Sequence, residues 1–246
     1  MREKTIELAT ADGDMTTFVV HPERGGPHPL VIFLMDAAGI REELRDMARR
    51  IASTGYYVIQ PNLYHRQGVL ELPADATYDD MSVLLQQVTM EMVMRDCDAV
   101  LQYAEDDTAA EAATLAVVGY CMTGQHAVNY AARHPERVVA AASFHGVRLV
   151  TDKPDSPHLM MQKAKARIYF GCAELDAYAP MEMVRALSEA VDATGVDAEV
   201  EILKGLDHGF VFPSRPMYDK LGAEQHYERL GALLRAKLPP PTGARA

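Results

Sequence analysis

One stretch, from Leu115 to His134, constrains the fold of this chain more than any other. The sequence LAVVGYCMTGQHAVNYAARH starts with an apolar run, passes through Gly119-Tyr120-Cys121-Met122-Thr123-Gly124 and continues into an amphipathic segment. This pattern predicts a strand, a tight turn with a thiol at its tip, and a helix. Such a turn exposes a nucleophilic side chain at the C-terminal edge of a sheet, near a helix N-terminus. Cys121 is therefore a candidate nucleophile; the alternative is an ordinary buried thiol.

The rest of the chain alternates strand and helix patterns behind an antiparallel start. A hairpin is expected around Asp12-Gly13-Asp14. Apolar runs then predict strands at 29–35, 56–60, 115–118, 138–144, 166–171 and 198–203. Helical periodicity predicts helices at 40–51, at 79–106 (broken once), from the turn after Cys121 to about 134, at 180–194 and at 224–237. We therefore expect an α/β fold: a mostly parallel central sheet, helices on both faces, antiparallel N-terminal strands and no large cap domain.

Composition narrows the class of protein. The 246 residues are 48% hydrophobic and contain no linker in mid-chain and no repeat, which predicts one domain over 1–238 and a disordered tail over 239–246. The net charge of -11 excludes a nucleic-acid partner. The polar start and the absence of a long apolar run predict no signal peptide, no membrane segment and a cytoplasmic location. Three cysteines are too few for a disulfide framework or a zinc site. A monomer and a homodimer both remain open.

Three residues with complementary chemistry follow successive predicted strands. A thiol, an acid and an imidazole occur in the order Cys121, Asp176, His208. In an open parallel sheet, sites form at the carboxyl ends of the strands. A nucleophile, an acid and a histidine in this chain order are typical of an α/β-hydrolase. Asp176 could instead cap the next helix, Glu174 is its rival as the acid, and His208 could be a plain loop histidine.

Each of the three has an expected role. The Cys121 thiolate would attack, His208 would move the proton, and Asp176 would orient the imidazole. Backbone N–H groups of Ala37 and Met122 would bind the oxyanion.

Two further residues, Tyr64 and His145, could line the substrate pocket. The alternatives are a solvated loop for Tyr64 and a structural hydrogen bond for His145.

Four sequence segments together resemble the dienelactone hydrolase family of the α/β-hydrolase superfamily, over residues 29 to about 238. They are GYCMTG at Cys121, AELDAYAP at Asp176, LDHGF at His208, and MDAAGIREELRDMARRIASTGYYVIQPNLY. The resemblance implies a Cys-His-Asp triad with no metal and no organic cofactor. It also implies a carboxylate after the third strand, at Asp36, that holds the resting thiol neutral until substrate binds.

The chain departs from the family pattern at three places. Thr123 stands where the family usually has glycine, so we expect a slightly opened turn. Asp36 replaces the more common glutamate. Phe212 occupies the position of the arginine that holds a substrate carboxylate, and the nearest arginine is Arg215.

The combined reading is a hydrolase of small esters or lactones that acts through an acyl-Cys121 thioester. Promiscuous attack on activated esters, including phosphotriesters, is chemically conceivable in the same site. The alternatives are a true dienelactone hydrolase (carboxymethylenebutenolidase) of aromatic catabolism, and a catalytically silent member of the family that binds a ligand.

Overall fold

The computed structural model describes residues 1–73 and 76–241, and the chain forms two compact units. Unit 1 comprises residues 1–115 and the chain from 240 onward, and unit 2 comprises residues 116–239. Strand β5 (Ala110–Tyr120) begins in unit 1 and ends in unit 2. The domain boundaries expected from the sequence stay a prediction.

Unit 1 is built on the predicted hairpin. Strands β1 (Arg2–Thr10) and β2 (Gly13–His21) pair antiparallel, and β2 pairs antiparallel with β4 (Tyr57–Pro61). Strand β3 (His28–Leu34) pairs parallel with β4. Every residue of β3 and β4 is buried, as a continuous apolar run requires. The antiparallel N-terminal strands are thus confirmed.

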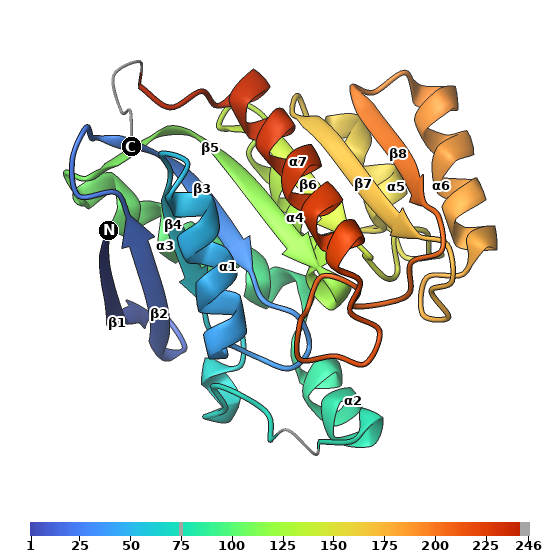
Figure 1. Ribbon diagram of the computed structural model, residues 1–246, viewed down its shortest axis with the longest axis horizontal. Helices are drawn as coiled ribbons and strands as arrows, with labels where there is room; N and C mark the ends of the chain where they lie inside the picture. Colours follow the sequence, from blue (N-terminus) through green and yellow to red (C-terminus); the bar gives the residue numbers. More distant parts are fainter. Residues whose placement is uncertain (74–75, 242–246) are drawn as a thin grey trace. The chain divides into compact units, whose positions relative to one another are not determined.

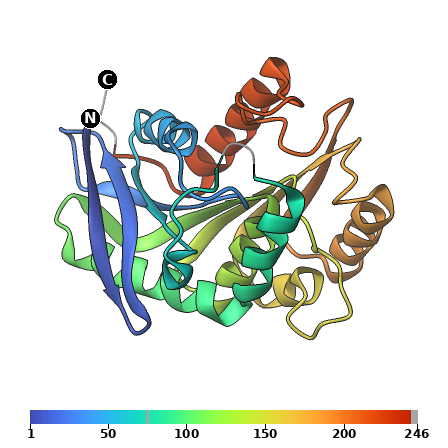
Figure 2. The ribbon, with the colours of Figure 1, turned by 90° about the horizontal axis from the view of Figure 1, so that it is seen from below.

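Helices cover both faces of these strands. Helix α1 (Glu42–Ala52) lies on one face and α3 (Met90–Asp106) on the other (Figures 1 and 2). The expected break in 79–106 separates α2 (Tyr78–Gln87) from α3. Each of the two helices has its own threonine cap, because Thr77 accepts from the Asp80 N–H and Thr89 from the Met92 N–H. The 3₁₀ turn η1 (His65–Gln67) follows β4.

Unit 2 contains the parallel strands that carry the predicted site. Strands β6 (Val138–Phe144), β7 (Arg167–Ala173) and β8 (Ala198–Leu203) pair in parallel. Helix α7 (Lys220–Lys237) lies on one face, and α4 (Gly124–Arg133) and α5 (Pro157–Met160) lie on the other (Figures 1 and 2). Helix α6 (Met181–Thr194) packs beside β8. The 3₁₀ turns η2 (Cys121–Thr123) and η3 (Met161–Lys163) complete the unit.

The structure confirms the α/β fold with mostly parallel strands, and it differs from the sequence reading in detail. Helix α5 lies in a stretch for which the sequence patterns predict no element, because four residues are too short to display helical periodicity. Helix α7 begins at Lys220 rather than at 224, since Asp219 caps it by accepting from the Gly222 N–H. Of the predicted disordered tail, residues 242–246 lie outside the described residues. No helix among the described residues is long and apolar enough to cross a membrane.

Candidate active site

The turn that carries Cys121 has a strained backbone. Cys121 adopts a φ of 53°, in the left-handed region that non-glycine residues rarely occupy. Its carbonyl oxygen accepts hydrogen bonds from the backbone N–H groups of Gly124 and Val147, which hold the turn in place. Such conformations cost about 1–3 kcal/mol and concentrate at functional sites. The side chain at the tip is partly exposed, unlike the buried Cys97 and Cys172.

Thr123 closes this turn rather than opening it, which corrects the sequence-based expectation. Its hydroxyl accepts from the Tyr120 N–H at 2.9 Å and donates to the Tyr120 carbonyl at 3.0 Å. The side chain is fully buried. The close approach that the family assigns to glycine occurs here at Gly124, where a Cβ would lie 2.2 Å from Ser143 Oγ. The threonine therefore clamps the strand end to the start of the turn.

Asp176 and His208 meet at the carboxyl ends of β7 and β8. The His208 Nδ1–H donates to Asp176 Oδ2 at 2.7 Å. The other carboxylate oxygen, Oδ1, accepts from the backbone N–H groups of Tyr178 and Ala179 at 2.8 and 3.0 Å. Asp176 thus anchors the loop before α6 and holds the imidazole, whereas the N-cap of α6 is Pro180, without a side-chain cap.

The rival acid, Glu174, is engaged elsewhere. Its Oε2 accepts from the backbone N–H of Gly205 at 2.8 Å, and it stabilises the loop after β8. The carboxylate that pairs with His208 is that of Asp176.

Cys121 lies next to His208 and interacts with its imidazole. Because Nδ1 is used by Asp176, the remaining ring nitrogen, Nε2, is the one available to the sulfur. Burial lowers the pKa of His208, but the interactions with Asp176 and Cys121 outweigh this effect and raise that pKa to about 10. The three residues predicted from the sequence are therefore brought together within unit 2.

Buried aromatic side chains pack behind the His208 ring. His145 is fully buried, and its ring packs edge-on against His208 with 5.0 Å between centroids. Phe210 and Phe212 pack edge-on against His145 in turn. Burial, together with the charges of His208 and His226, holds the pKa of His145 well below its usual range. His145 thus supports the histidine as a neutral ring, and its expected contact with substrate stays a prediction.

Tyr178 is a neighbour of His208 that the sequence reading missed. Its ring packs on the imidazole with 4.9 Å between centroids and an interplanar angle of 64°. The sequence signal that could have found Tyr178 is its position two residues after Asp176, on the loop that approaches the histidine.

In unit 1, the carboxylate of Asp36 is bound to an arginine. Arg41 donates to Asp36 Oδ1 at 2.6 Å and to Oδ2 at 3.2 Å, and it also pairs with Glu43. The Asp36 and Arg41 side chains are almost fully buried. The sequence reading missed this partner, although Arg41 lies only five positions along the chain. Control of the thiol by Asp36 stays a prediction.

Two other predicted residues of unit 1 contact each other. Tyr64 is fully buried, and its hydroxyl donates to the Ala37 carbonyl at 3.0 Å. This bond fixes the loop after β3, whose Ala37 N–H is one of the two expected oxyanion donors. Met122, the source of the other, is buried directly after Cys121. Both donor roles stay predictions.

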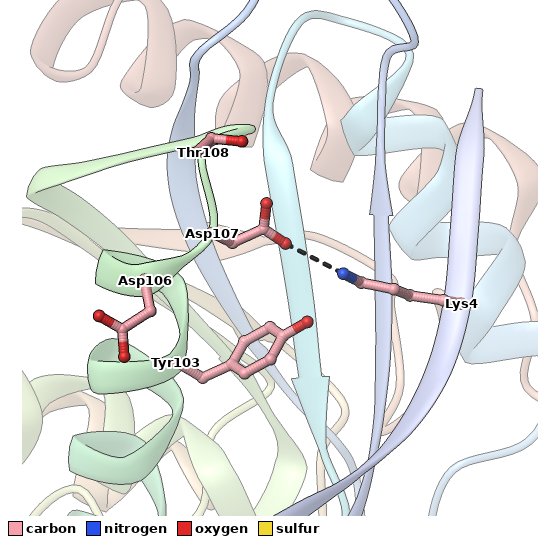
Figure 3. Close-up of a pocket in the computed structure, with 5 residues that line it drawn as sticks. All are labelled: Lys4, Tyr103, Asp106, Asp107 and Thr108. Atoms are coloured by element: carbon pink, nitrogen blue, oxygen red, sulfur yellow. Dashed lines mark hydrogen bonds and ion pairs between the residues drawn. The ribbon is translucent and has the colours of Figure 1, made fainter.

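A separate surface pocket of about 300 Å³ lies in unit 1 (Figure 3). It is lined by Lys4, Tyr103, Asp106, Asp107 and Thr108. The Lys4 ammonium pairs with Asp107 at 3.0 Å, and the Tyr57 hydroxyl donates to the same carboxylate. These contacts tie β1 to the end of α3. No cluster of metal-ligating side chains occurs in the described parts of the chain.

Comparisons with known proteins agree with this arrangement of elements. The model of the dienelactone hydrolase family matches residues 15–238. A relative from Methylorubrum extorquens, named "Putative carboxymethylenebutenolidase", is 28% identical over 229 residues, covering 92% of this chain and 78% of the relative. The crystal structure of a "Putative Dienelactone Hydrolase" from Klebsiella pneumoniae matches with a TM-score of 0.86 at 26% identity, over 94% of this chain and 97% of that one.

A third protein shares the fold. It is the "Dienelactone Hydrolase-like Promiscuous Phospotriesterase P91" from metagenomic libraries, with a TM-score of 0.82 at 17% identity over 96% of this chain and 98% of that one. The family model spans nearly the whole chain, including Cys121, Asp176 and His208. The chain therefore belongs to the dienelactone hydrolase family and is a hydrolase of the α/β-hydrolase fold.

Proposed function

We propose that this hydrolase cleaves small neutral esters or lactones with Cys121 as nucleophile, His208 as acid and base, and Asp176 as the group that orients the imidazole. The observation that carries the proposal is the hydrogen bond from His208 to Asp176, with Cys121 next to the same imidazole at the tip of a strained turn. A thiol, an imidazole and a carboxylate in this connection are the parts that nucleophilic acyl transfer requires.

The electrostatics favour His208 as the group that receives the Cys121 proton. The pKa of His208 is raised to about 10, so the ring holds a proton firmly at neutral pH. The Asp176 carboxylate, bound by two backbone N–H groups, stabilises the imidazolium. The thiolate that this proton transfer leaves at Cys121 is the nucleophile.

The reaction then proceeds in two steps, which are formation of the acyl-Cys121 thioester and its hydrolysis. The Cys121 thiolate attacks the carbonyl carbon, and the carbonyl electron pair moves to the oxygen, which the Met122 N–H group would bind. Collapse breaks the bond to the leaving oxygen, which takes the Nε2 proton of His208 and departs as an alcohol. His208, now neutral, removes a proton from water, whose oxygen attacks the thioester. The acid product leaves, and the thiolate and imidazolium are restored.

A neutral substrate fits the site better than a carboxylate-bearing dienelactone. Phe212, which stands where the family holds a substrate carboxylate, is buried against His145 and Tyr120. A phenyl ring in that position offers no charge to a carboxylate. The phosphotriesterase named among the structural neighbours supports, by likeness of fold, a secondary reaction with activated phosphotriesters.

The test compares wild type with Cys121→Ala on p-nitrophenyl acetate and butyrate, with Cys97→Ala as the matched control. We expect Cys121→Ala to lose nearly all activity and Cys97→Ala to keep it, because Cys97 is buried in α3. Equal rates for wild type and Cys121→Ala would refute the assignment. If neither protein exceeds the rate in buffer alone, a ligand-binding member of the family becomes the better interpretation.

Alkylation provides a second readout that needs no substrate. Iodoacetamide should label Cys121 far faster than Cys172 in the folded protein. Burial, assisted by the charge of Asp176, raises the pKa of the Cys172 thiol to about 12, which leaves almost no thiolate there at neutral pH. Equal labelling of the two cysteines would contradict an activated thiol.

A neutral lactone and a carboxylate-bearing dienelactone distinguish the substrate classes. We expect the higher kcat/KM for the neutral lactone. A strong preference for the anion would instead favour a true dienelactone hydrolase.

A further inference from the structure

The imidazole of His208 has two aromatic neighbours of different character. His145 is fully buried, whereas Tyr178 is 54% exposed although its ring contacts the same imidazole at 4.9 Å. The backbone N–H of Tyr178 donates to Asp176 Oδ1, which fixes the start of this side chain. Tyr178 is therefore an aromatic surface held beside His208 and open to solvent.

Other apolar side chains accompany Tyr178 around the loops of Asp176 and His208. Leu175 is 60% exposed, and its backbone N–H donates to the Leu206 carbonyl at 2.9 Å. The Met217 sulfur lies 4.0 Å from where a Cβ on Gly209, the residue after His208, would stand, and Met217 is also exposed. Exposed apolar groups gathered at one place on a soluble domain commonly mark a binding surface.

The proposed mechanism determines which part of a substrate contacts this surface. The leaving oxygen takes its proton from His208, so it must come within hydrogen-bond reach of the imidazole. The group attached to that oxygen then lies beside the neighbours of His208, and Tyr178 is the accessible one. Aromatic rings pack favourably on a tyrosine ring.

We propose that Tyr178 is a specificity-determining residue that binds an apolar, preferably aromatic, leaving group, so that the substrates are neutral esters of phenols or other apolar alcohols. This inference rests on the proposed function and adds to it the chemical class of the alcohol part. Leu175 and Met217, on the loops of Asp176 and after His208, are further exposed apolar side chains.

The experiment measures kcat/KM for phenyl acetate and methyl acetate in wild type, Tyr178→Ala and Tyr178→Phe. Intrinsic leaving-group reactivity is the same for every variant, so a change in the phenyl-to-methyl ratio reports the protein alone. Alanine keeps the backbone N–H that binds Asp176 but removes the ring. We expect Tyr178→Ala to lower the ratio about fivefold, in line with the energy of an aromatic pair, and Tyr178→Phe to preserve it.

Two controls separate this role from general damage. The ratio for methyl butyrate over methyl acetate, which varies only the acyl group, should not change in Tyr178→Ala. Leu159→Ala, which removes an exposed apolar side chain of α5, should leave both ratios unchanged.

An unchanged phenyl-to-methyl ratio in Tyr178→Ala would overturn the inference. An equal loss for all substrates would also overturn it, because that result means that the ring only positions His208. Failure of the proposed function is distinguishable, since it requires that Cys121→Ala keep its activity.

Discussion

Replacement of Asp176 by asparagine tests the orientation of His208 with little disturbance of the fold. The asparagine Oδ1 can keep the hydrogen bonds from the Tyr178 and Ala179 N–H groups. The amide NH₂ then faces His208 Nδ1 in place of the carboxylate. A donor in that place forces Nδ1 to accept, so the proton of the neutral ring moves to Nε2, next to the sulfur.

We expect Asp176→Asn to lower kcat strongly and the stability of the fold only slightly. The imidazole in this tautomer can no longer take a proton from the thiol or from water, and the imidazolium loses its counterion. Loss of the orienting carboxylate in such triads lowers kcat by roughly 10⁴-fold, which corresponds to about 5 kcal/mol of transition-state stabilisation. Because the backbone hydrogen bonds remain, we expect the free energy of unfolding to fall by only about 1 kcal/mol.

Steady-state hydrolysis of p-nitrophenyl acetate and urea unfolding provide the two measurements. Glu174→Gln is the matched control, because it neutralises the neighbouring carboxylate that binds Gly205 instead of His208. A kcat within tenfold of wild type for Asp176→Asn, or a larger loss for Glu174→Gln, would refute this account of the acid.

The remaining predictions concern the turn and the charge of the histidine. Thr123→Val should lower the free energy of unfolding in urea by about 2 kcal/mol, because it leaves the buried Tyr120 N–H and carbonyl without the hydroxyl; an unchanged value would mean that the clamp is unimportant. Gly124→Ala should lower the free energy of unfolding by about 1–3 kcal/mol, since the new Cβ would lie 2.2 Å from Ser143 Oγ. Wild-type stability of this variant in urea would contradict the prediction. NMR titration should find His208 protonated up to about pH 10, and the pKa should be lower in Cys121→Ser. Because this folded-state pKa exceeds the unfolded value near 6.5, the resulting stabilisation is complete below about pH 6 and disappears as pH rises through the folded pKa. A titration of wild-type His208 near pH 6.5 would refute the charge pair.

Much of the fold could be predicted from the sequence, because it depends on local patterns. The continuous apolar run of β3 and the period of α1 are visible in any short window, and β6 has the bounds that were expected. The order of Cys121, Asp176 and His208 was readable for a related reason. Parallel strands bring their carboxyl ends to one edge, so chain order already implies proximity.

The details that escaped prediction depend on contacts between residues whose pairing leaves no pattern. Thr123 in place of glycine predicts a more open turn, because nothing in the sequence shows that its hydroxyl bonds to the Tyr120 backbone. The pairing of Asp36 with Arg41 depends on the path of the loop between them. The choice between Asp176 and Glu174 likewise required the direction of two side chains on one loop.

The central claim, that Cys121 forms the acyl intermediate, is tested most directly by trapping that intermediate. Wild type is mixed with p-nitrophenyl acetate, quenched in acid during turnover and digested for peptide mass spectrometry. The account predicts one acetyl group on the peptide that contains Cys121, and none on the same peptide of Cys121→Ala. Turnover without a modified Cys121, or acetyl groups spread equally over Cys97, Cys121 and Cys172, would contradict it.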